Sequence, residues 1–66
     1  MNRYSYTGPV CEFGKLVQEK WTGETMAISE KKARSNLIFQ WKKTNNRAAY
    51  SNVSLPGKIV LEEYYG

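Results

Sequence analysis

The amino-acid sequence predicts an α+β fold with the element order β-β-α-β, in which one helix packs on a small, mostly antiparallel, three-stranded sheet. Two segments rich in β-branched and aromatic residues come first, separated by a glycine turn signal. A segment with a helix start signal and helical apolar spacing follows them. A short apolar segment after a Pro-Gly pair comes last. The 66 residues have room for one domain, which we assign to residues 1–66.

The first strand is predicted over residues 3–13. Tyr4, Tyr6 and Val10 share a parity there, so they are expected on one face of the sheet. Gly8-Pro9 lies inside this segment, and proline has no N–H for the ladder. We therefore expect either a bulge in this strand or an edge position for it.

The chain is predicted to reverse at Gly14-Lys15 and to return as a strand over residues 16–28. Gly23 in this return strand indicates a second bulge or the close approach of another backbone. The residues expected on the face that the helix covers are Trp21, Thr25 and Ala27.

The helix is predicted over residues 30–44. Ser29 is a good N-cap because its hydroxyl can accept a hydrogen bond from a first-turn N–H, and Glu30 places negative charge where the helix dipole favours it. Asn45-Asn46 can take the left-handed turn that ends a helix. At 100° per residue, the apolar side consists of Ala33, Leu37, Ile38 and Trp41. The opposite, basic side consists of Lys31, Lys32, Ser35, Asn36, Phe39, Lys42 and Lys43.

The chain after the helix is predicted to begin with a polar loop over residues 45–54. Leu55-Pro56-Gly57-Lys58 has the Pro-Gly centre of a type II turn. The last strand is predicted over residues 58–63, with Ile59 and Leu61 on one face.

Charge is distributed unevenly along the sequence. The formal net charge is +4, and from Lys31 through Leu61 there are seven basic residues and no acidic one. A segment that carries only positive charge indicates a polyanion or an acidic protein as partner. Solubility of a small domain is the alternative explanation of the same charge.

The sequence has no histidine and one cysteine, Cys11. Without histidine, metal-ligand clusters and Ser/Cys–His nucleophile pairs are excluded on composition, so we expect no enzyme and no cofactor. A single thiol suits a reducing cytoplasm, where we expect Cys11 to pack as a small apolar residue. Because no signal peptide and no apolar run of about 20 residues are present, no membrane location is expected.

The basic side of the helix is the first candidate site, because an exposed aromatic ring among lysines suits a nucleic acid. Arg34, Arg47 and Lys58 are predicted to extend its positive surface, although a salt bridge to a strand glutamate is an alternative for Arg34. The predicted nucleic-acid-binding residues are Lys31, Lys32, Phe39, Lys42, Lys43 and Arg47. A solvated helix face is one alternative reading, and a protein contact anchored by Phe39 is another.

The sheet face away from the helix is a further candidate. Tyrosines and Met26 or Ile28 are expected to stay exposed there, either as a dimer contact or as a platform that stacks bases. A monomer and a homodimer are both compatible with the sequence.

Motifs along nearly the whole chain are similar to those of a family of small uncharacterised proteins from conjugative elements and prophages of Gram-positive bacteria. These motifs are Tyr6-x-Gly8-Pro9-Val10, Phe13-Gly14, Trp21-x-Gly23-Glu24-Thr25-x-Ala27-x-Ser29-x-Lys31-Lys32-Ala33-x-x-Asn36-Leu37, Gln40-x-Lys42-Lys43 and Leu55-Pro56-Gly57-Lys58-Ile59. The resemblance implies accessory service on mobile DNA in a bacterial cytoplasm. The chain also resembles, more loosely and mainly in architecture, the archaeal large-subunit ribosomal protein LX.

Taken together, these patterns predict a cytoplasmic mobile-element accessory protein that binds nucleic acid, or a nucleoprotein, through the basic side of its helix. The alternative is a protein-interaction module, such as a small inhibitor or regulator, that works as a dimer through the open sheet face.

Overall fold

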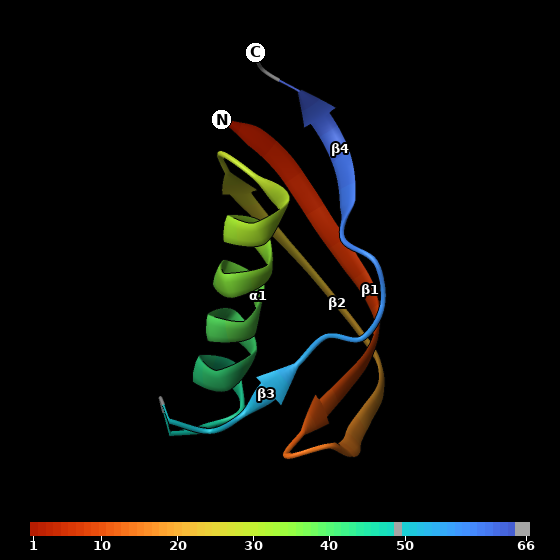
Figure 1. The fold of residues 1–66 in the computed structure, drawn as a ribbon, viewed down its shortest axis with the longest axis vertical. Helices are drawn as coiled ribbons and strands as arrows, with labels where there is room; N and C mark the ends of the chain where they lie inside the picture. The colour runs from red at the N-terminus through yellow and green to blue at the C-terminus, as the bar shows by residue number, and fades with distance from the viewer. Residues whose placement is uncertain (49, 65–66) are drawn as a thin grey trace.

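Over residues 1–48 and 50–64, which a computed structural model describes, the chain forms one helix and a single antiparallel sheet. The elements are β1 (Asn2–Glu12), β2 (Lys15–Ala27), α1 (Glu30–Thr44), β3 (Val53–Ser54) and β4 (Val60–Tyr64). The helix lies along one face of the sheet (Figure 1). The predicted α+β class and the predicted element order are therefore confirmed.

The strand β1 is the centre of the sheet. It pairs with β2 along one edge, and with both β3 and β4 along the other edge. β3 pairs at Cys11 and Glu12, whereas β4 pairs at residues 2–5. The sheet is thus three strands wide, and its third position is filled by two short strands at opposite ends of β1 (Figure 1).

Pro9 lies in a bulge of this central strand. Gly8 pairs with Trp21 of β2, but Val10 pairs with Gln18, so the ladder shifts register across Pro9. Of the two expectations for Gly8-Pro9, the bulge is confirmed and the edge position is wrong. The expected bulge at Gly23 is also wrong, because this glycine pairs in register with Tyr6. What lies close to Gly23 is the ring of Trp21, and a Cβ on the glycine would approach it to 2.5 Å.

The β1–β2 turn consists of Phe13 and Gly14, one residue earlier than predicted. Their φ angles are 53° and 79°, and two positive values in a two-residue loop are the signature of a type I′ hairpin turn. This geometry matches the twist of the flanking strands, which favours it over other turns.

The helix begins and ends where its capping signals predict. The Ser29 hydroxyl accepts a hydrogen bond of 3.2 Å from the Lys32 N–H, and Glu30 lies in the first turn. At the other end the Asn45 N–H donates to the Trp41 carbonyl, and Asn46 takes a positive φ of 56°.

The core lies between α1 and the sheet. The helix contributes Ala33, Leu37 and Trp41, all buried, and the Trp41 indole donates a hydrogen bond of 2.9 Å to the Gln18 side chain. The buried residues from the rest of the chain are Tyr4, Tyr6, Val10, Ala27, Val53, Leu55 and Ile59. Trp21 and Ile38 pack against this core, as the predicted faces of β2 and the helix require.

The chain after the helix departs from three predictions. Gly57 does not have a positive φ, so the expected type II turn is wrong. Instead, the Gly57 N–H donates to the Tyr6 hydroxyl at 3.1 Å, and a Cβ on Gly57 would lie 3.0 Å from the same oxygen. The predicted loop over residues 45–54 includes the short strand β3. Leu61, expected on the same face as Ile59, is 50% exposed, although it pairs with the buried Tyr4.

Candidate functional site

The outer face of α1 presents most of the predicted site. We define this face by Lys31, Lys32, Ser35, Phe39, Lys42 and Lys43. The Phe39 side chain is 63% exposed, whereas Trp41, two residues later, is 2% exposed. The predicted division of the helix into a buried apolar side and an exposed basic side with Phe39 at its centre is therefore present.

Two adjoining hollows lie along this face. The larger has a volume of about 590 Å³, and its lining consists of Ser35, Ile38, Phe39, Lys42, Lys43 and Arg47. The smaller has a volume of about 270 Å³, and its lining consists of Ile28, Ser29, Lys31, Lys32 and Ser35. Because Ser35 lines both, the hollows form one track from the start of the helix to its end. The track has an apolar floor and lysines at each end.

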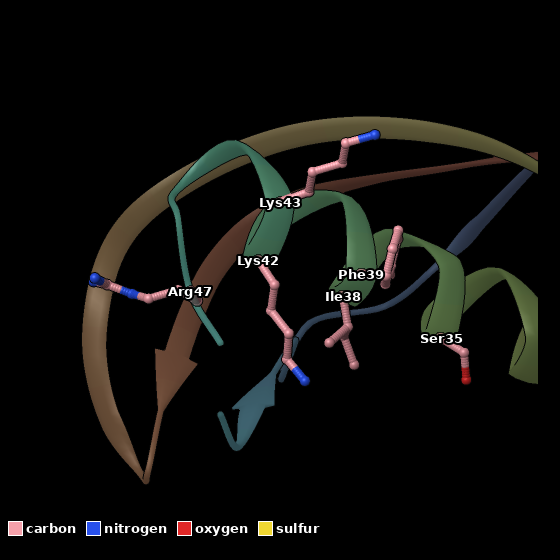
Figure 2. Close-up of a pocket in the computed structure, with 6 residues that line it drawn as sticks. All are labelled: Ser35, Ile38, Phe39, Lys42, Lys43 and Arg47. Carbon is pink, nitrogen blue, oxygen red and sulfur yellow. The ribbon is translucent and has the colours of Figure 1, made fainter. Parts of the chain in front are cut away.

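Figure 2 shows how the side chains of the larger hollow lie. Lys42 and Lys43 extend in opposite directions from neighbouring positions of the helix, and the Phe39 ring lies between their ammonium groups in this view. Ile38 forms apolar surface beside the ring. A flat apolar ligand on Phe39 would therefore have a cation on either side.

Arg47 borders the larger hollow, but its guanidinium group points away from the other five side chains (Figure 2). Its Nε atom lies 3.3 Å from a carboxylate oxygen of Glu12, and its Cζ atom lies 5.5 Å from the centroid of the Trp41 ring. These contacts tie the chain after the helix to β1. Of the six predicted residues, Lys31, Lys32, Phe39, Lys42 and Lys43 share the outer face, and Arg47 does not contribute its charge there.

Three polar side chains of the helix turn inward instead of outward. Arg34 donates to the carbonyls of Leu55 and Gly57, the latter at 3.2 Å. Asn36 donates to the Met26 carbonyl at 3.4 Å, and Gln40 donates to the Glu24 carbonyl at 3.0 Å. Neither the exposed cation nor the salt bridge predicted for Arg34 is found.

Three of the six glutamates, Glu24, Glu62 and Glu63, lie on the sheet face away from the helix. On the face away from the helix, Arg3 forms ion pairs with Glu24 at 3.4 Å and with Glu63 at 2.6 Å. The Ser5 hydroxyl donates to Glu62 at 2.6 Å. Within the described part of the chain, Lys31, Lys32 and Lys43 form no ion pair. The face away from the helix therefore has Glu24, Glu62 and Glu63 beside Arg3, whereas the outer face of α1 has four lysines.

The expected aromatic platform on the open sheet face is wrong in one respect. Tyr4 and Tyr6 are buried under the helix, so they are not available there. Thr7 and Thr22 meet on the open face, with 3.3 Å between their hydroxyls, beside the Arg3 ion pairs. Met26 is exposed as expected.

No protein-family model, no curated protein and no solved structure was found to match the chain. The predicted mobile-element family thus stays a prediction. Over residues 1–48 and 50–64, no group of three metal-ligating side chains lies together, and no helix is long and apolar enough to cross a membrane.

Proposed function

We propose that the chain binds nucleic acid, free or within a nucleoprotein, through the outer face of α1. The observation that carries the proposal is the exposed Phe39 ring, which lies in a hollow bordered by Lys42 and Lys43. No acidic residue occurs between Lys31 and Leu61, so nothing in that segment offsets the positive charge of the helix. An apolar ring among ammonium groups matches the base and the phosphates of a nucleotide.

Binding would use two kinds of contact. The lysines would neutralise phosphates and release their counterions, which makes affinity depend on salt. Phe39 would add stacking on a base, worth about 1–3 kcal/mol. The charge division between helix and sheet would also orient the molecule, because the side with Glu24 and Glu62 is repelled by a polyanion. The proposal includes no catalytic step.

The setting that we propose is the cytoplasm of a Gram-positive bacterium, with the chain as an accessory protein of a mobile element. The support for this setting is the motif resemblance described above. An acidic or apolar protein surface is the alternative partner, with Phe39 as the anchor of the contact.

A salt titration with a matched pair of variants tests the proposal. One variant replaces Lys31 and Lys43 by Gln, and the control replaces Lys15 and Lys20 by Gln. All four lysines are exposed, and each variant loses two charges from a net charge of +4. Fluorescence anisotropy with a labelled oligonucleotide measures the affinity between about 50 and 200 mM salt.

We expect the parent and the control to bind with a steep salt dependence, since about three or more phosphate contacts give a slope near −2 to −3 in log affinity against log salt. The helix variant is expected to lose most of its affinity and most of that slope. Equal affinities of the helix variant and the control would contradict the proposal. A bound protein partner with affinity that is insensitive to salt would favour the alternative.

A further inference from the structure

We infer that the ligand of the outer face of α1 is a single-stranded nucleic acid, bound without regard to its base sequence. This inference rests on the proposed function and adds the class of substrate to it.

The Arg, Asn and Gln side chains of α1, which could read a base pair, are engaged elsewhere. Arg, Asn and Gln read duplex sequence through forked, bidentate hydrogen bonds with base edges, and Lys can also bridge the two acceptors of guanine. Every Arg, Asn and Gln side chain of α1 donates inside the protein: Arg34 to the β3–β4 connection, and Asn36 and Gln40 to β2.

Two of the three such side chains directly after α1, Asn45 and Arg47, have the same property. The Asn45 side chain donates to the Trp41 carbonyl at 2.9 Å, and Arg47 is held by Glu12. What the outer face presents is lysine, serine and phenylalanine. These side chains can contact phosphates and the flat faces of bases. Of the contacts that read base edges, they offer only those of Lys with guanine and of Ser, and none of the two-point contacts that Asn and Gln make with adenine.

The exposed Phe39 ring favours a single strand over a duplex. The bases of a duplex are stacked on one another, so their flat faces are not offered to a protein side chain unless the duplex is deformed. A single strand can present an unstacked base, and aromatic stacking accepts every base because each has a π-face. The Phe39 side chain is 63% exposed, and the hollow around it leaves its ring open to such a base.

The lysines and Phe39 are spaced along the track so that one strand could contact them all. Lys31 and Lys43 are twelve residues apart on one helix, which places them about 18 Å apart along its axis. Phe39 lies between these ends, and Ser35 joins the two hollows. One strand along the helix would therefore meet cations at both ends and the ring between them.

The experiment compares four labelled probes of equal length, about 12 nucleotides. They are oligothymidylate, oligodeoxyadenylate, a mixed-sequence duplex, and an abasic strand that keeps its phosphates and lacks its bases. We expect the two single strands to bind within about threefold of each other. The duplex and the abasic strand are expected to bind about tenfold more weakly, since both lack a base on which Phe39 can stack.

A variant series isolates the ring. Phe39→Ala is expected to weaken oligothymidylate binding about tenfold and to leave binding of the abasic strand unchanged. Phe39→Tyr keeps an aromatic ring and is expected to bind within about twofold of the parent. Because Phe39 is exposed, all three proteins should unfold at the same urea concentration.

The outcomes separate this inference from the proposed function. Failure of all four probes to bind would overturn both. The inference alone would be overturned by three results together: the duplex binds as tightly as the single strands, Phe39→Ala has no effect, and the lysine variant binds more weakly. A preference of tenfold or more between the two single strands would also overturn it, because it would show that base edges are read.

Discussion

Phe13 has a backbone conformation that its residue type does not predict. Its φ of 53° lies in the left-handed region, where a residue with a Cβ is disfavoured by roughly 1–2 kcal/mol. The first position of a type I′ turn usually holds Asn, Asp or Gly. The Phe13 side chain is 64% exposed, so the ring gains little burial in exchange for this backbone conformation. Gly14 therefore signals the turn in the sequence, but Phe13 is atypical at the first turn position, and the start of the turn is predicted one residue late.

The Phe13→Asn variant is expected to be more stable than the parent by about 1 kcal/mol, since Asn adopts positive φ with less strain. The midpoint of urea unfolding, with an unchanged slope, measures the gain. Phe13→Ala is the control, because it removes the same ring and keeps the strain. A gain of the same size in Phe13→Ala would show that the exposed ring, and not the backbone, is responsible.

At the scale of the element, α1 protects the free edge of β2. Among the described residues this edge has no strand partner, and a long free edge is a site for pairing with other chains. Asn36 and Gln40 lie one helical turn apart and donate to the Met26 and Glu24 carbonyls. Further along β2, the Gln18 side chain donates to the Lys20 carbonyl at 3.4 Å. Side-chain amides thus occupy acceptors that an added strand would need.

The double variant Asn36→Ala, Gln40→Ala is expected to lose about 2 kcal/mol of stability, about 1 for each hydrogen bond, and to associate with itself more strongly than the parent. Sedimentation velocity at matched concentrations measures the association. Ser35→Ala, on the exposed side of the same helix, is the control and should change neither property. Sedimentation of the double variant identical to that of the parent would show that the amides do not guard the edge.

The helix itself is the element that the sequence predicts best. Ser29, Glu30 and Asn46 are local signals, and they act through the first and last turns whatever the rest of the chain does. Non-local features were predicted poorly for the opposite reason. The inward turn of Arg34 depends on where residues 55–57 cross the molecule, and a pairing as short as Val53-Ser54 leaves almost no pattern in a sequence.

The residues of the candidate site also differ in how well the sequence predicts their positions. Lys31, Phe39 and Lys43 fall on the predicted face because helical periodicity alone fixes their direction. Arg47 lies beyond the last helical turn, where periodicity no longer applies, and Glu12 and Trp41 decide where its charge points.

At the scale of the whole molecule, the fold depends on which of two neighbouring aromatic residues is buried. Trp41→Ala is expected to destabilise the protein by about 3–5 kcal/mol, most of what so small a domain has. Phe39→Ala is the control and should stay within about 0.5 kcal/mol of the parent, since Phe39 is exposed. Thermal unfolding measured by circular dichroism tests both. A melting temperature that falls more in the Phe39 variant than in the Trp41 variant would show that the buried and exposed faces of the helix are assigned the wrong way round.

The Tyr6 hydroxyl donates to the Pro9 carbonyl at 2.6 Å and accepts from the Gly57 N–H, so it joins the first strand to a segment some fifty positions later. On a ribosome, the chain emerges from its amino-terminal end. Leu55, Gly57 and Ile59 emerge after the hairpin and the helix, so the core and the second hydrogen bond of Tyr6 are incomplete until that segment has left the exit tunnel. A nascent chain that stops before Gly57 therefore lacks the donor for this hydroxyl.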